Sequence, residues 1–172
     1  IASKAYDELP KYINIGQSEI DITSIMKKKL LDLGVDHTLY MSCASGVGGY
    51  NQIICDPTEK ILMEGDVLTI DTGSTLDGYF CDFNRNYGFG KIAPSVKAAY
   101  KILWEASEEG MLAAKPGNTC SDISNAMLKI LKKNSPNNNN VGRMGHGIGL
   151  QVTEPPSIMQ DDKTLLKENM II

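Results

Sequence analysis

The sequence predicts a mixed fold of helices and strands, built from two similar halves that each contain two helices followed by a β-hairpin. Eight residues of one helical segment recur in the same order 101 positions later. A second set of residues recurs 103 positions later, where residues 62–68 resemble residues 165–171. Such self-similarity is typical of an internal repeat. The eight residues of the first set are Gly16, Ser18, Asp21, Ile22, Thr23, Met26, Lys28 and Leu30, matched by Gly117, Thr119, Asp122, Ile123, Ser124, Met127, Lys129 and Leu131.

The first half is expected to begin with two helices. Residues 2–13 have the composition of a helix, which Gly16 interrupts. Ser18 and Asp21 resemble a capping box, in which two residues three positions apart bond each other's backbone amides at a helix start. The second helix then runs to about residue 33 and ends at Gly34. Residues 38–54 favour strands but lack a clear periodicity.

The second half repeats this order. Pro94 is expected to open a helix that reaches about residue 114, and Thr119 begins another that ends near residue 133. An Asn-rich loop at residues 135–140 and a Gly-rich segment follow. The second hairpin would begin only where the sequence stops. We therefore expect halves at about residues 1–92 and 93–172, in a domain that is truncated at its C-terminus and continues beyond Ile172.

Composition excludes several classes of partner. With 17 basic and 21 acidic residues the net charge is −4, which argues against nucleic acid or an anionic membrane surface as the main partner. The apolar runs are far shorter than the ~20 residues that a bilayer span needs. The four cysteines are scattered without metal-binding spacing, so we expect free thiols and a cytoplasmic location.

Two aspartates in the first hairpin are the first candidates for chemistry. Strands are expected at residues 67–71 and 79–83, and a turn centred on Leu76 and Asp77 would place Asp71 opposite Asp82 with Cβ atoms ~5 Å apart. Carboxylates this close repel each other unless they are protonated or neutralised by a cation. Facing oxygen ligands suit divalent metal ions. The alternative is that either residue is a turn or solvent-facing residue.

A histidine in the second half is the other candidate. His146 lies in a Gly-rich run, and glycines on both sides would let the backbone or a substrate approach it closely. A single histidine is more often structural, and His37, which lacks such surroundings, is taken as structural. Glu154 follows before two prolines and is expected either to orient the site or to cap a loop.

Together these segments resemble the metallopeptidase family that includes methionine aminopeptidase, prolidase, aminopeptidase P and creatinase. The resemblance implies the pita-bread fold, an α+β fold of two pseudo-symmetric halves. It also implies two divalent metal ions (Mn, Co, Zn or Fe) held by two aspartates, a histidine and two glutamates. The matching residues are Gly65 to Gly73, Gly78, Tyr79, Asp82, Arg85 and Gly90, and later Gly145 to Leu150 with Glu154 and Pro155.

Carried over residue by residue, Asp71, Asp82 and His146 are the expected metal ligands. The two family glutamates would fall beyond Ile172, so the catalytic residues of this chain are unknown and the segment alone is expected to be inactive. Thr153 stands where the peptidases place a substrate-binding histidine before Glu154, and both are expected to contact substrate. Ile54 stands in the place of a second family histidine.

The resemblance implies a metal-dependent hydrolase of the Xaa-Pro aminopeptidase or dipeptidase type, acting on a small peptide or a small amide. A metal-bridged hydroxide would attack the carbonyl group. One alternative is a creatinase-like or ectoine-hydrolase-like C–N hydrolase, or a lyase, acting on a small solute, which Thr153 and Ile54 favour. The other is a non-catalytic peptidase-like binding module, against which the three retained ligands argue. Prolidase-like relatives dimerise, so a homodimer is a further expectation.

Overall fold

The computed structural model describes residues 1–51, 54–134 and 142–172, and it forms two compact units, Ile1–Ala93 and Pro94–Ile172. The expected Asn-rich loop lies outside the described residues. Among the described helices, none combines the length and the apolar character that crossing a membrane requires.

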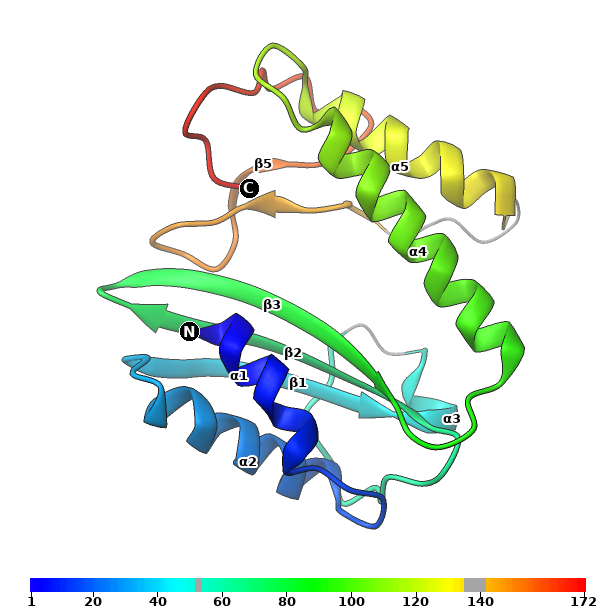
Figure 1. Ribbon diagram of the computed structural model, residues 1–172. Coiled ribbons are helices and arrows are strands. Elements are labelled where there is room, and N and C mark those ends of the chain that lie inside the picture. Colours follow the sequence, from blue (N-terminus) through cyan, green and yellow to red (C-terminus); the bar gives the residue numbers. More distant parts are fainter. Residues whose placement is uncertain (52–53, 135–141) are drawn as a thin grey trace. The chain divides into compact units, whose positions relative to one another are not determined.

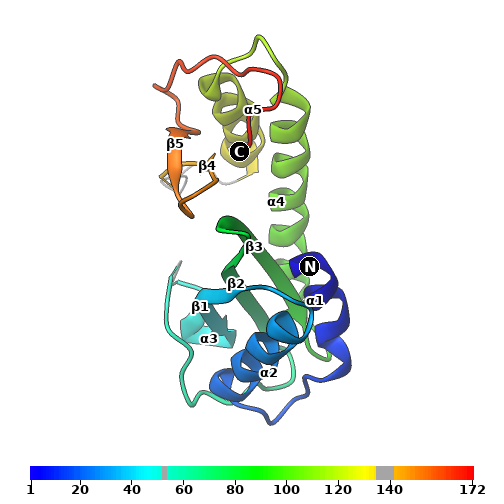
Figure 2. The ribbon, with the colours of Figure 1, turned by 90° about the vertical axis from the view of Figure 1, so that its left-hand side faces the viewer.

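The first unit is a three-stranded antiparallel sheet with α1 and α2 packed on one face (Figures 1 and 2). The strands, in spatial order, are β1 (His37–Ser45), β2 (Val67–Leu76) and β3 (Tyr79–Gly88). The helical segments are α1 (Ala2–Glu8), η1 (Leu9–Lys11), α2 (Glu19–Asp32) and the short α3 (Gly46–Gly49). Strand β1 overlaps the first part of residues 38–54, the segment that favoured strands but had no clear periodicity.

Alternation along β2 separates the two faces of this sheet. Leu68 and Ile70 are fully buried in the core that α1 and α2 form with the sheet. Tyr6 of α1 anchors this packing: its ring stacks on Phe83 with centroids 6.4 Å apart, and its hydroxyl lies 2.7 Å from the carbonyl oxygen of Phe83. Because successive residues of a strand point to opposite faces, Asp71 belongs to the face away from the helices.

The described part of the second unit contains two helices and a small sheet. Its elements are α4 (Pro94–Ala113), α5 (Cys120–Asn134), β4 (His146–Gly147) and β5 (Glu154–Ser157), and the two strands pair antiparallel. Its core contains Cys120, Ile123, Ile158 and Leu166. Three of the four expected helices, α2, α4 and α5, are confirmed to within about a residue at their ends. The first, expected at residues 2–13, is shorter: α1 ends at Glu8, and the 3-10 helix η1 continues only to Lys11.

The repeat is visible in the backbone hydrogen bonds of both units. In the first unit the amide of Gly16 donates to the carbonyl of Leu62, and the amide of Leu62 donates back to residue 17, both at 2.9 Å. In the second unit Gly117 and Leu166 make the same exchange, through residue 118, at 3.0 and 2.8 Å. Gly16 and Gly117 have similar positive φ angles, 97° and 93°. We call this paired exchange the clasp.

The clasp corrects the second of the two sequence offsets. Leu62 is equivalent to Leu166, an offset of 104 rather than the expected 103. Burial gives the reason: Leu62 and Leu166 are 0% and 5% exposed, whereas Leu165 is 52% exposed. Two adjacent leucines left the alignment ambiguous by one residue, and packing selects the second of them. Val67, the first residue of β2, is therefore equivalent to Ile171.

The expected capping boxes are confirmed at both helix starts. At α2 the amide of Asp21 donates to the Ser18 hydroxyl and the amide of Ser18 donates to the Asp21 carboxylate, both at 3.1 Å. Thr119 and Asp122 make the same pair of bonds at α5: the amide of Asp122 donates to the Thr119 hydroxyl at 3.2 Å, and the amide of Thr119 donates to the Asp122 carboxylate at 2.7 Å. Hydrogen bonds from the Ser18 side chain and then its amide lower the pKa of Asp21 below its usual range.

Replacing Asp21 by Ala is expected to lower the melting temperature at neutral pH, and the loss should vanish in acid. A folded-state pKa that is depressed contributes stability above the unfolded value of ~4, and this contribution is lost as the pH falls through the lower folded value. Thermal unfolding followed by circular dichroism from pH 7 to pH 2 measures the difference. The exposed Asp7 of α1 provides the control variant Asp7→Ala. A loss of equal size at every pH would contradict the capping role of the charge.

Glu19, the first residue of α2, is a buried carboxylate that the sequence did not single out. Glu19 is only 3% exposed. Its carboxylate accepts hydrogen bonds from the Ser45 hydroxyl at 2.7 Å and from the amide and hydroxyl of Thr58 at 3.0 and 2.8 Å. It thereby ties the start of α2 to the end of β1 and to the segment before β2.

Replacing Glu19 by Ala is expected to lower the free energy of unfolding by about 2–4 kcal/mol, because the buried Ser45 hydroxyl and the two donors of Thr58 would lose their common acceptor. Urea unfolding at pH 7 measures this change. The matched control is Glu59→Ala, at the exposed glutamate that follows Thr58. Equal midpoints for the two variants would show that the Glu19 bonds add nothing.

Candidate metal site

The β2–β3 hairpin carries both candidate aspartates on one face. Asp71 pairs with Asn84, and Asp82 pairs with Gly73, so the expected direct pairing of the two aspartates is wrong by two residues. The turn residues are Asp77 and Gly78, with φ of 52° and 79°. Positive φ at both positions is the requirement of the type I′ hairpin turn, which Asp-Gly favours.

A shift of two residues leaves the face unchanged, because side chains alternate with a period of two. Asp71 and Asp82 are therefore diagonal neighbours rather than directly opposed. The hydroxyl of Tyr40, on β1, lies 3.1 Å from Oδ1 of Asp71 and 2.7 Å from Oδ1 of Asp82. One hydroxyl thus contacts both carboxylates. Sequence reasoning missed Tyr40.

The electrostatics of this pair fit a cation site. Burial, and then the charge of Asp82, raise the pKa of Asp71 to about 6. A positive ion between the carboxylates would offset both effects, because an opposite charge stabilises the ionised form. Carboxylate oxygens are the ligands that hard and borderline divalent ions accept. The residues present in the first unit therefore fit part of a divalent metal site.

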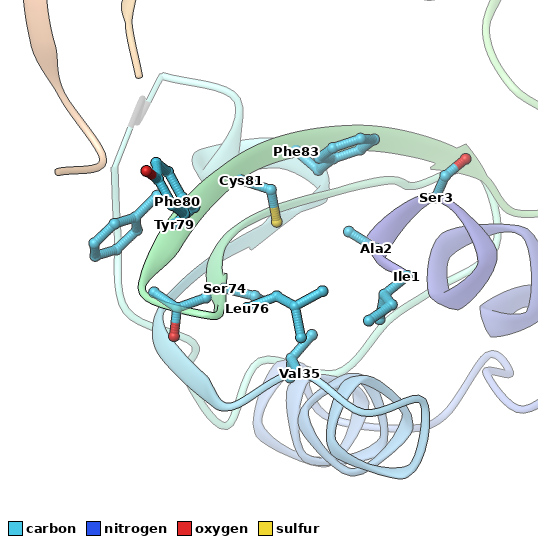
Figure 3. A pocket seen from close by; sticks show the side chains of 11 residues that line it. Ile1, Ala2, Ser3, Val35, Ser74, Leu76, Tyr79, Phe80, Cys81 and Phe83 are labelled. Atoms are coloured by element: carbon cyan, nitrogen blue, oxygen red, sulfur yellow. The ribbon is translucent and has the colours of Figure 1, made fainter. Parts of the chain in front are cut away.

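The opposite face of the sheet bears a separate apolar pocket of about 340 Å³ (Figure 3). Val35, Leu76 and Cys81 lie around it, next to the start of α1. Neither Asp71 nor Asp82 lines it. We therefore do not assign it to the chemistry of the aspartate pair.

His146, in the second unit, lies on β4 and pairs with Ser157 of β5. Its Nδ1 is 2.9 Å from the carbonyl oxygen of Gly147. A Cβ atom at Gly147 would overlap the carbonyl of Pro155 on β5. The expectation of close backbone approach is therefore confirmed at Gly147, where the partner is the neighbouring strand. Gly145 instead faces the side chain of Ile158, and approach of a substrate stays a prediction.

The two expected substrate-binding residues make local contacts. Glu154 accepts a hydrogen bond from the amide of Gln151 at 2.7 Å, which closes the turn before β5. Thr153 is exposed, and its hydroxyl accepts a bond from Arg143 at 3.3 Å. Glu154 therefore makes the loop-capping contact that was one of its two expected roles. A substrate role for Thr153 or Glu154 stays a prediction.

The three expected metal ligands divide between the two units, with two aspartates in the first and His146 in the second. In the described ranges, no group of three or more His, Cys, Asp or Glu side chains is arranged to hold a metal ion. The complete ligand set is therefore still a prediction.

Comparison with known proteins decides the family. A model of metallopeptidase family M24 matches residues 1–172, the whole chain. The chain belongs to metallopeptidase family M24. An Xaa-Pro dipeptidase from Pyrococcus furiosus is 33% identical over 115 residues, which cover 67% of this chain and 33% of the relative. The matched part of this M24 chain thus covers about a third of that relative.

Solved structures show that the M24 chain has the pita-bread fold. An Xaa-Pro dipeptidase from Bacillus anthracis matches 98% of this chain and 48% of its own, with a TM-score of 0.93 and 25% identity. A methionine aminopeptidase from Rickettsia prowazekii, at 23% identity, has the same fold, with a TM-score of 0.81 over 98% of this chain and 71% of its own. The predicted fold class is therefore confirmed.

Proposed function

We propose that the natural protein containing this chain is a metal-dependent hydrolase of Xaa-Pro peptides, either a dipeptidase or an aminopeptidase. The observation that carries the proposal is the Asp71–Asp82 pair, two carboxylates on one sheet face with the pKa of Asp71 raised to about 6. Family membership and the name of the Pyrococcus furiosus relative support the substrate class.

In this proposal Asp71, Asp82 and His146 hold two divalent ions, with Mn, Co, Zn and Fe as the candidates. When bound, such ions polarise a carbonyl oxygen and lower the pKa of water. The aspartates contribute negative charge and orientation, and Tyr40 holds both carboxylates from one side. Two further glutamates are proposed to follow Ile172, as the family resemblance implies.

The repeat supports a continuation of the domain. Because Val67 is equivalent to Ile171, the hairpin of residues 67–88 would correspond to residues 171–192. Helix α4 also carries large exposed apolar side chains, with Trp104 at 59% and Met111 at 71% exposed. We propose that a second hairpin covers this apolar surface of α4 in the natural protein.

A second candidate function keeps the metal and changes the substrate. Thr153 and Ile54 stand where the peptidases of the family carry substrate-binding histidines, and Ile54 is 81% exposed. The Ile54 side chain cannot form a hydrogen bond with a peptide, and the Thr153 hydroxyl is a shorter group than an imidazole and cannot carry a positive charge. This difference favours a C–N hydrolase of a small solute as the alternative.

A location and an assembly are also part of the proposal. All four cysteines are free thiols, which suits a reducing compartment such as the cytoplasm. A homodimer is proposed from the resemblance to prolidases.

The test is a substrate panel on the purified natural protein, reconstituted in turn with manganese, cobalt, zinc and iron. Hydrolysis of Xaa-Pro dipeptides or of longer Xaa-Pro peptides supports the peptidase. Release of amine from creatine-like or ectoine-like solutes, without peptide hydrolysis, selects the alternative. A protein that stays metal-free with every ion would support the non-catalytic binding module instead.

A further inference from the structure

We propose that Tyr40 is a positioning residue that holds the Asp71 and Asp82 carboxylates in place for metal binding and thereby sets the metal affinity. The inference rests on the proposed function, because it assumes that this pair binds metal. Three features of the first unit support it: the hydroxyl contacts, an irregularity in β1, and a glycine in β2.

The hydroxyl contacts span the two strands of the hairpin. Asp71 lies on β2 and Asp82 on β3, while Tyr40 reaches them from β1, at 3.1 and 2.7 Å. A neutral donor between two like charges reduces their repulsion without adding a competing positive charge. A tyrosine hydroxyl is a neutral group that can both donate and accept a hydrogen bond.

An irregularity in β1 aims the side chain at the pair. Thr38 is opposite Ser74, but Tyr40 is opposite Gly73, so Leu39 is the extra residue of a β-bulge. With regular pairing Leu39 would lie opposite Gly73, and Tyr40 would point to the helix-covered face. Bulges of this kind reorient side chains next to functional sites. Here the bulge moves the tyrosine to the aspartate face.

The glycine opposite Tyr40 makes room for its ring. A Cβ atom at Gly73 would overlap the ring carbon Cε1 of Tyr40. Glycine inside a strand often marks such a close approach. The backbone is fixed as well, because the Thr72 hydroxyl donates to the carbonyl of Tyr40 at 3.1 Å. Bulge, glycine and backbone bond together leave the ring little freedom to move away from the pair.

The experiment compares metal affinity in the natural protein and its Tyr40→Phe variant, using titration calorimetry with Mn²⁺. Residues that orient metal ligands typically contribute 10–100-fold in affinity, so Tyr40→Phe is expected to raise the Kd for Mn²⁺ by about that factor. The melting temperature without metal should change little, since the phenyl ring keeps its packing. A purely structural role would instead lower that temperature and leave the Kd unchanged.

Two further variants complete the design. Tyr12→Phe removes a hydroxyl that accepts a bond from Lys29 at 3.4 Å, away from the sheet, and is expected to leave the Kd unchanged. Gly73→Ala keeps the Tyr40 hydroxyl but displaces its ring, and is expected to weaken Mn²⁺ binding as Tyr40→Phe does. Near-ultraviolet circular dichroism checks that each variant is folded.

The outcomes separate this inference from the proposed function. If the natural protein binds Mn²⁺ and Tyr40→Phe binds it equally well or more tightly, the positioning role of Tyr40 is overturned and the hydrolase proposal stands. If the natural protein binds none of the four metals, the proposed function is overturned, and the inference about Tyr40 is overturned with it. Weaker binding by both Tyr40→Phe and Gly73→Ala, with Tyr12→Phe unaffected, supports the inference.

Discussion

Replacing Asp82 by Ala is expected to abolish hydrolysis by the natural protein and to remove most of its bound metal. The proposed pair shares cations between two carboxylates on adjacent strands, and a site with one of them has lost both a ligand and a negative charge. Asp71 would then be left half-buried beside the Tyr40 hydroxyl without its charged neighbour. Elemental analysis after dialysis, together with Xaa-Pro dipeptide hydrolysis, measures both losses.

The same hairpin provides a matched control. Asp77 is also an aspartate, but it lies in the turn with φ of 52°, a conformation that asparagine tolerates well. Asp77→Asn removes one charge from the hairpin and should retain both metal and activity. If Asp82→Ala kept its full metal content, Asp82 would not be a ligand, and the site would have to be sought elsewhere.

The 172-residue chain studied alone is expected to bind divalent metal weakly and to show no hydrolysis, in contrast to the natural protein, for which we expect about two ions per chain. Two aspartates and one histidine supply too little charge for two dications, which need several carboxylates. The chain should also bind a hydrophobic dye such as ANS, because the apolar face of α4 around Trp104 and Met111 is exposed.

Parallel calorimetry and dye binding on the two lengths of protein measure this difference. Extension by the residues that naturally follow Ile172 should restore metal binding and suppress the dye signal together. A variant of the short chain with Trp104→Gln should lower the dye signal without restoring metal binding. This variant therefore distinguishes the loss of exposed apolar surface from the completion of the metal site. Tight binding of two ions by the short chain would contradict the proposal that ligands follow Ile172.

Helix starts and the repeat could be predicted because their determinants are local. A capping box needs only a hydroxyl and a carboxylate three residues apart, so Ser18 with Asp21 identifies the start of α2 without any knowledge of the rest of the fold. That Asp71 and Asp82 share one face of the sheet was also predictable, because side chains alternate between the two faces and a register error of two residues does not change the face. The exact pairing required choosing between Leu-Asp and Asp-Gly as the turn, and the conformational preference of Gly78 decides it.

Tyr40 could not be predicted in the same way. A bulge adds one residue to one strand and reverses the alternation from that point, and nothing in the sequence around Leu39 signals the extra residue. Glu19 was missed for a related reason: its partners, Ser45 and Thr58, are distant in sequence and meet it only in the folded unit. Contacts between distant segments were the part of the site that pattern reasoning could not reach.

The clasp has a consequence for how the two halves diverge. It consists of amide and carbonyl groups, which mutation of a side chain leaves in place unless proline is introduced. Only Gly16 and Gly117, with their positive φ angles, are chemically restricted. Side chains elsewhere in each half can therefore change over generations while the main-chain geometry is inherited. Residue identity between the halves consequently understates their similarity, which is better recorded in hydrogen-bond pairs such as those of Leu62 and Leu166.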